Sequence, residues 1–130
     1  MRAAFGFGTG LFLLCIAMGS QAEDRNRENY LLHCSGCHLS EGVGVPGTTP
    51  SLRALAPILA APGGREYLGR VPGVVQAPLS DAELAELLNW VLLTMSDAPA
   101  DPPYSETEIG SLRAKPIRDT VAAREALFSN

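Results

Sequence analysis

The feature that most constrains this chain is a short run that brings two thiols and an imidazole together, Cys34-Ser35-Gly36-Cys37-His38. Its C-x-x-C-H spacing is typical of covalent c-type haem attachment. Two cysteines three positions apart on a helical turn can each form a thioether with one haem vinyl group, and His38 can then be the proximal ligand to the iron. We therefore predict one covalent haem c held by Cys34 and Cys37, and one-electron chemistry at its iron.

A zinc half-site, a dithiol–disulfide motif and a structural disulfide are the alternatives for these two cysteines. A zinc site needs further Cys or His ligands, and no Cys or His follows His38 in the sequence. A dithiol oxidoreductase usually carries C-x-x-C at the start of a helix that follows a strand, and no strand pattern is visible here. Both comparisons favour haem attachment.

The first 22 residues have the features of a secretory signal peptide. Arg2 supplies a positive charge, an apolar run follows at residues 11–18, and Ala22 ends a small-x-small cleavage site. The apolar run is short for a membrane span, and charged residues follow it at once, with an uncleaved anchor as the alternative. We expect export to the periplasm, because covalent haem attachment takes place outside the bacterial cytoplasm. Cys15 then leaves with the signal.

The mature chain is the size of one domain and is acidic. Removal of 22 of the 130 residues leaves 108, and the loss of Arg2 leaves nine basic residues against 14 acidic ones, a net charge of −5. This balance argues against nucleic acid or anionic lipid as a partner. It suits docking on a basic protein surface.

The sequence predicts an all-α fold. Its strongest helical pattern covers residues 81–95, where Ser80 and Glu83 form a capping box and apolar side chains repeat with the helical period. Ser105 and Glu108 form a second capping box. Weaker helical patterns cover residues 24–37, 51–59, 64–70, 105–114 and 118–128, and glycines and prolines break the chain at 41–50 and 72–73.

Three landmarks carry a resemblance to the class I cytochrome c family. The first is the haem motif, which closes an N-terminal helix. The second is residues 47–52, which are similar to the family's Gly-Pro-x-Leu stretch, and the third is residues 79–84 leading to Trp90, which are similar to its C-terminal helix. The resemblance covers residues 24–96 and implies that the first and last core helices cross beside the haem. It also implies that the carbonyl of Pro50 accepts a hydrogen bond from Nδ1 of His38. Simple turn punctuation is the alternative for Pro50.

The distal side departs from the family pattern. The usual distal ligand is a Met in the loop before the last core helix, and the matching loop, residues 71–78, contains no Met. Met95 is the only Met left after signal removal, and it could ligate the iron only if its helix end approaches the distal face. Its place in the apolar stripe favours packing instead. Tyr67 and Lys115 are rarer ligands that the sequence leaves open.

Three arginines are candidates for pairing with haem propionates, because the guanidinium fork matches a carboxylate. A solvated surface charge is the alternative for each. They are Arg53, Arg65 and Arg70.

The expected organisation is a signal peptide at 1–22, a haem domain at 23–97, and a Pro-rich linker with a helical extension at 98–130. The extension should fold back on the haem domain and cover Trp90 and Leu93, since its own short helices need a partner surface. A tail that binds a redox partner is the alternative. The apolar positions of the extension are Ile109, Leu112, Val121, Leu127 and Phe128.

The leading functional hypothesis is a periplasmic electron carrier or the cytochrome subunit of a dehydrogenase. Its partners would be redox proteins, such as a periplasmic dehydrogenase or a terminal oxidase or reductase, and a membrane only if the signal is uncleaved. No Ser–His–acid set is present, so we do not expect an enzyme. The alternative function is a five-coordinate haem protein that binds a small ligand or reacts with peroxide, and the missing distal Met is its only support.

Overall fold

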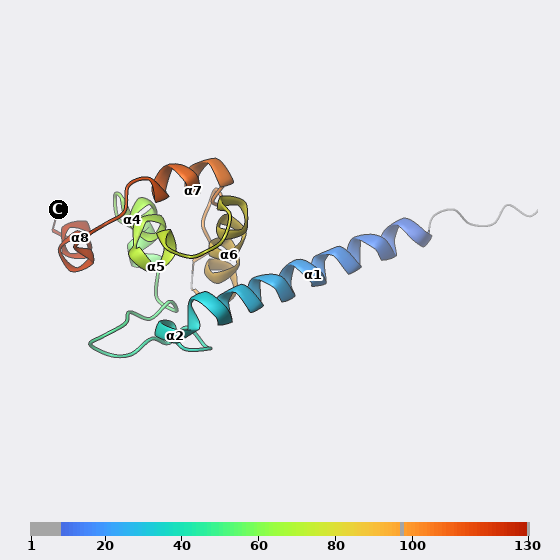
Figure 1. Cartoon of the computed structure of the whole chain (residues 1–130), viewed down its shortest axis with the longest axis horizontal. Coiled ribbons are helices and arrows are strands. Elements are labelled where there is room, and N and C mark those ends of the chain that lie inside the picture. The colour runs from blue at the N-terminus through green and yellow to red at the C-terminus, as the bar shows by residue number, and fades with distance from the viewer. Residues whose placement is uncertain (1–8, 97, 130) are drawn as a thin grey trace, which may run out of the picture.

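The computed structural model describes residues 9–96 and 98–129, with side chains from residue 21 onward, and this part of the chain is helical without strands (Figure 1). The predicted all-α class is confirmed. The helices are α1 (Thr9–His33), α2 (Ser35–His38), α3 (Ala56–Ala60), α4 (Gly64–Arg70), α5 (Pro72–Val75), α6 (Asp81–Thr94), α7 (Glu106–Arg113) and α8 (Thr120–Leu127).

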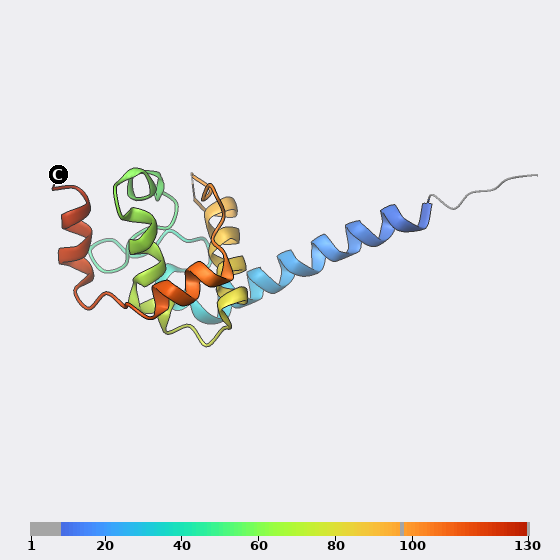
Figure 2. The same cartoon turned by 90° about the horizontal axis from the view of Figure 1, so that it is seen from above.

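Helix α1 extends far from the other helices at its N-terminal end, and its C-terminal end packs across α6 (Figures 1 and 2). At that crossing the rings of Tyr30 and Trp90 lie with their centroids 6.0 Å apart and tilted by 50°. The crossing of the first and last core helices agrees with the resemblance. Within the described residues, no helix is both long and apolar enough to span a membrane. The signal peptide stays a prediction, and residues 1–8 lie outside the described part.

The two predicted capping boxes have different outcomes. At α6, the Ser80 hydroxyl accepts from the Glu83 amide and the Glu83 carboxylate accepts from the Ser80 amide, so this box is complete. At α7, the Ser105 hydroxyl accepts from the Glu108 amide. The Glu108 carboxylate does not return to Ser105, because it is bound to Arg65 on α4 instead.

Two helix predictions need correction. The helix expected at residues 51–59 begins only at Ala56, because the Leu52 amide is bonded to the Gly42 carbonyl in the preceding loop. The sequence pattern does not predict helix α5, since it indicates a break at Pro72. Proline is well suited to the first turn of a helix, because amides in that turn have no acceptor within the helix and the missing N–H costs no hydrogen bond. Pro72 starts α5 in this way.

Two clusters of buried side chains form the core, one on each side of α6. The smaller cluster lies at the α1–α6 crossing and contains Tyr30, Leu87 and Val91. The larger one joins α3, α4, α6 and α7 with the linker before α7. Its buried members are Leu55, Ile58, Tyr67, Ala77, Leu84, Ala85, Leu92, Tyr104, Ile109 and Leu112.

The extension folds back on the haem domain, as predicted, but on a different surface from the one expected. Ile109 is fully buried in the larger cluster. Leu93, by contrast, stays 69% exposed, and Trp90 packs against Tyr30 rather than the extension. The extension meets the face of α6 that carries Leu92, and Leu93 points away from both clusters.

Candidate haem site

The haem motif forms one tight helical turn at the end of α1. The amides of Cys37 and His38 both donate to the Cys34 carbonyl, at 3.2 and 3.0 Å. Cys34 is half-buried and Cys37 is exposed, and both thiols are free. Burial, followed by the nearby Cys37, raises the pKa of the Cys34 thiol, so this group is protonated at neutral pH. Cys34 and Cys37 are three residues apart on a helical turn, so their side chains lie on the same side of it. One reactant can therefore reach both thiols.

The imidazole of His38 is held by the backbone of Pro50. Nδ1 of His38 lies 3.0 Å from the Pro50 carbonyl oxygen, so the expected hydrogen bond is present. Because a carbonyl can only accept, the proton stays on Nδ1 and the lone pair of Nε2 is left for a metal ion. Burial lowers the pKa of His38 against the opposing effect of this bond, which favours the neutral ring that a metal requires.

A close approach at Gly44 brings Pro50 to the histidine. The Gly44 amide donates to the His38 carbonyl at 3.0 Å, and Gly44 has a φ of +68°. A Cβ at this position would lie 2.4 Å from the Thr49 carbonyl oxygen and 2.7 Å from that of Pro50. Only glycine fits there. In the sequence this glycine indicates only a break in the chain, and no local pattern predicts its part in the site.

The start of the same loop is fastened to α1 by a buried tyrosine. The Tyr30 hydroxyl donates to the Leu39 carbonyl at 2.6 Å, and the Tyr30 side chain is fully buried. Leu39 takes a φ of +62°, a backbone conformation that residues other than glycine rarely adopt. The hydrogen bond from Tyr30 thus holds the loop at the point where the chain leaves α2.

The donor set fits a haem c and does not fit zinc. It consists of two thiols and one neutral imidazole with a free Nε2, the groups that a covalent haem uses. Among the described residues, no group of three or more His, Cys, Asp or Glu side chains could hold a metal ion on its own. The loop after His38 also leaves Val43 and Val45 about two-fifths exposed, an apolar surface that a haem beside them would cover.

Comparisons with known proteins agree with this geometry. Cytochrome c-552 of Thermus thermophilus is 35% identical over 118 residues, which cover 72% of this chain and 90% of the relative. A cytochrome c-552 from one particular strain of the same species is also 35% identical over 118 residues, covering 72% of this chain and 80% of the relative. No protein-family model matches. The chain belongs to the c-type cytochrome family. Membership implies a covalent haem c and electron transfer.

This chain is shorter than these cytochromes within the aligned region. The alignment is 118 residues long, whereas 72% of the 130 residues here is about 94, so the relatives have about two dozen residues that this chain lacks. Deletions of this size are tolerated in connections rather than in packed helices.

Met95 lies at the helix crossing. It packs against the cluster of Tyr30 and Leu87, and its sulfur lies 3.3 Å from the position that a Cβ on Gly42 would take. Gly42 belongs to the loop that begins directly after His38. This location favours the packing role of Met95 over the role of distal iron ligand.

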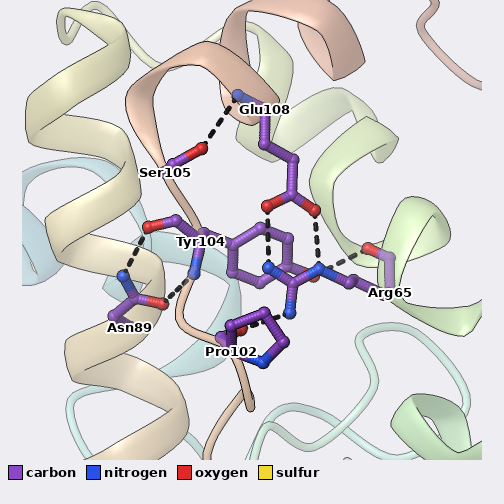
Figure 3. Close-up of polar contacts among 6 residues, drawn as sticks. All are labelled: Arg65, Asn89, Pro102, Tyr104, Ser105 and Glu108. Carbon is purple, nitrogen blue, oxygen red and sulfur yellow. Dashed lines mark hydrogen bonds and ion pairs between the residues drawn. The ribbon is translucent and has the colours of Figure 1, made fainter.

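Arg65 belongs to the docking of the extension on the rest of the molecule (Figure 3). Its guanidinium makes two parallel hydrogen bonds to the Glu108 carboxylate, at 2.6 and 2.7 Å, and a third to the Pro102 carbonyl at 2.6 Å. It also lies 4.2 Å from the centre of the Tyr104 ring. The hydrogen bonds from Arg65 hold the pKa of Glu108 below its ordinary value.

The other two propionate candidates are also bonded to protein groups. Arg53 donates to the Glu41 carbonyl and Arg70 to the Lys115 carbonyl. Each of these bonds uses only Nε, and the side chain of Arg53 is about half exposed. The pairing of Arg53 or Arg70 with a propionate stays a prediction.

Proposed function

We propose that the chain carries one electron on a single haem c that is attached to Cys34 and Cys37 and ligated by His38. The observation that carries this proposal is the hydrogen bond from His38 to Pro50, which leaves Nε2 free beside the two thiols. When bound, the haem supplies an iron that changes its charge by one. Pro50 holds the proton on Nδ1 and fixes the plane of the ring, so His38 does not need to turn between the two charge states.

The residues before the last core helix support electron transfer rather than acid–base catalysis. In residues 71–79, Gln76 has the only polar side chain, and it is exposed. Reaction with peroxide needs a side chain that moves a proton close to the iron. The described residues of this segment contain none that titrates.

We also infer that the mature protein works in the periplasm and meets redox partner proteins there. The signal-like residues 1–22 and the C-x-x-C-H motif support this, because both belong to exported proteins that acquire haem outside the cytoplasm. The acidic balance suits a partner with a basic surface, such as a dehydrogenase or a terminal oxidase or reductase. N-terminal sequencing of the periplasmic fraction should begin at Glu23.

The attachment can be tested by mass spectrometry of the protein matured in a host that makes c-type cytochromes. We expect the mature polypeptide plus one haem, and no loss of haem in acid acetone. His38→Ala should abolish the low-spin spectrum or stable maturation, whereas His33→Ala, at the half-buried neighbour before Cys34, should retain both. Haem that is extracted by acid acetone would refute the proposal.

A second function is favoured by one specific observation, the absence of Met from residues 71–79 in a chain whose Met95 packs elsewhere. A haem without a sixth side-chain ligand binds small molecules at its open position. The reduced spectrum with and without carbon monoxide decides between the two. An unchanged spectrum supports a six-coordinate carrier, and a shifted one supports ligand binding. Met95→Leu should leave either spectrum as it is.

A further inference from the structure

One arginine of the extension ties down the segment that precedes the last core helix. We call residues 71–79, which contain α5 and most of the connection to α6, the strap. Arg113, at the end of α7, donates to three carbonyls of the strap and to one carboxylate. The distances are 3.3 Å to Val75, 2.9 Å to Ala77, 2.8 Å to Leu79 and 2.7 Å to Oδ1 of Asp81.

These bonds restrain a stretch in which helical bonding has ended. The carbonyls of Ala77 and Leu79 lie between α5 and α6, and Ala77 is buried. Buried carbonyls need donors, and a charged guanidinium with several N–H groups supplies them from one side chain. The approach of α7 is tight, since a Cβ on Gly110 would lie 2.7 Å from the second carboxylate oxygen of Asp81.

The strap lies between the extension and the haem motif. Figure 1 shows α5 between α7 and α2, and Figure 2, viewed from above, shows α2 behind the α4–α5 region. Val71 and Val74 pack against the larger core cluster, and Leu79 touches both clusters. The strap therefore joins the part of the core shared with the extension to the part beside the haem motif.

We propose that Arg113 is a positioning residue that holds the strap closed over the distal side of the haem and so limits the access of small ligands to the iron. This inference rests on the proposed function, since it needs a haem held by His38, and on the open sixth position of the second candidate function. The strap would then cover this side of the haem with apolar side chains. Its closure depends on the extension, because Arg113 comes from α7.

The test uses the haem-loaded full chain and two readouts: the rate of carbon monoxide binding to reduced protein after a light flash, and hydrogen exchange of the strap amides. In Arg113→Gln, loss of the charged hydrogen bonds should raise both rates about tenfold. Arg65→Gln is the matched control, because it loosens the extension without touching a strap carbonyl. Arg118→Gln, at an exposed position of the extension, should change neither rate.

Equal effects of Arg113→Gln and Arg65→Gln would overturn the proposal, since the extension would then act only through general stability. Failure of every variant to bind carbon monoxide would also overturn it. If Arg113→Gln does not fold, Asp81→Asn removes only the negative charge that faces Arg113 and should raise both rates by a smaller factor. Loss of the proposed function is recognised separately, because unattached haem is detected in wild type before any carbon monoxide is added.

Discussion

The two sides of α6 are held together by different means. On the side of the extension, a broad cluster of buried side chains is reinforced by Arg65, Asn89 and Arg113, which bind backbone groups of distant segments. On the side of the haem motif, the described core is limited to a small cluster around Tyr30, and the loop after His38 is closed mainly by its own backbone bonds. The extension side has a core of its own, whereas on the haem side we expect the haem to complete the core.

The largest effect is expected when the chain is produced without haem, and this experiment tests the contrast directly. We expect amide protection in the loop at residues 39–52 to fall about a thousandfold, equivalent to about 4 kcal/mol of local stability. Protection in α4 and α7 should fall much less. Hydrogen exchange followed by mass spectrometry measures both regions in one experiment. Equal losses on the two sides would show that the molecule is a single cooperative unit.

Truncation of the buried anchor of the extension should have the next largest effect. Ile109→Ala removes a fully buried side chain and should lower the free energy of unfolding by about 3 kcal/mol. Val121→Ala is the control, since Val121 is 67% exposed and should change it by less than about 0.5 kcal/mol. Denaturant unfolding of the haem-loaded protein provides both values. A similar cost for the two variants would mean that α7 docks no more firmly than α8.

The contact between α4 and α7 can be probed by adding a single methyl group. A Cβ on Gly69 would lie 2.4 Å from Cδ1 of Leu112, so Gly69→Ala should destabilise the protein by about 2 kcal/mol. Combining it with Leu112→Ala should remove most of that penalty, because the clash disappears. Gly73→Ala, where nothing lies within 4 Å of the added methyl, should have almost no effect on thermal unfolding. Additive costs in the double variant would argue against the close approach.

The pair of Arg65 and Glu108 makes stability depend on pH. The pKa of Glu108 is lower in the folded protein, so its contribution is complete above its unfolded pKa of about 4.5 and is lost as the pH falls through the folded value. Glu108→Gln should cost about 1.5 kcal/mol at pH 7, and this difference should shrink as the pH approaches 3. Unfolding curves of both proteins over that range measure the difference. If the difference in free energy of unfolding were the same at every pH, the charge of the Glu108 carboxylate would not be the source of the stabilisation.

The smallest effect is expected at the loop anchor on the haem side. Tyr30→Phe removes the hydrogen bond to the Leu39 carbonyl and should cost about 1 kcal/mol. Tyr67→Phe is the control, because its hydroxyl lies 3.5 Å from the Thr120 carbonyl and should contribute less. Urea unfolding of the haem-loaded proteins compares the two. The order of these costs would be reversed if the long contact were the stronger one.

Local patterns predicted the parts of this molecule whose causes lie close together in the sequence. Helix α4 has the expected bounds of 64–70, and α6 begins after Ser80 with its complete capping box. The bond between His38 and Pro50 joins residues 12 apart and came from the family resemblance, not from periodicity.

The features that were missed depend on long-range partners. Arg113 reaches residues 32 to 38 positions earlier, and Glu108 leaves its capping box for Arg65, 43 residues away. A local pattern contains no information about such partners. The exposure of Leu93 was missed for the same reason, since the face of α6 that the extension covers is decided by where α7 docks.

The arrangement of Arg65 between Glu108 and the Tyr104 ring has an evolutionary consequence. Arg65 is useful only when the extension is present, because without its acceptors on the extension it would be an unpaired charge beside the core. Related chains should therefore gain and lose Arg65 together with the extension. A homologue that ends before the linker should have a different residue in place of Arg65, and this one position should reveal which members of the family have the extension.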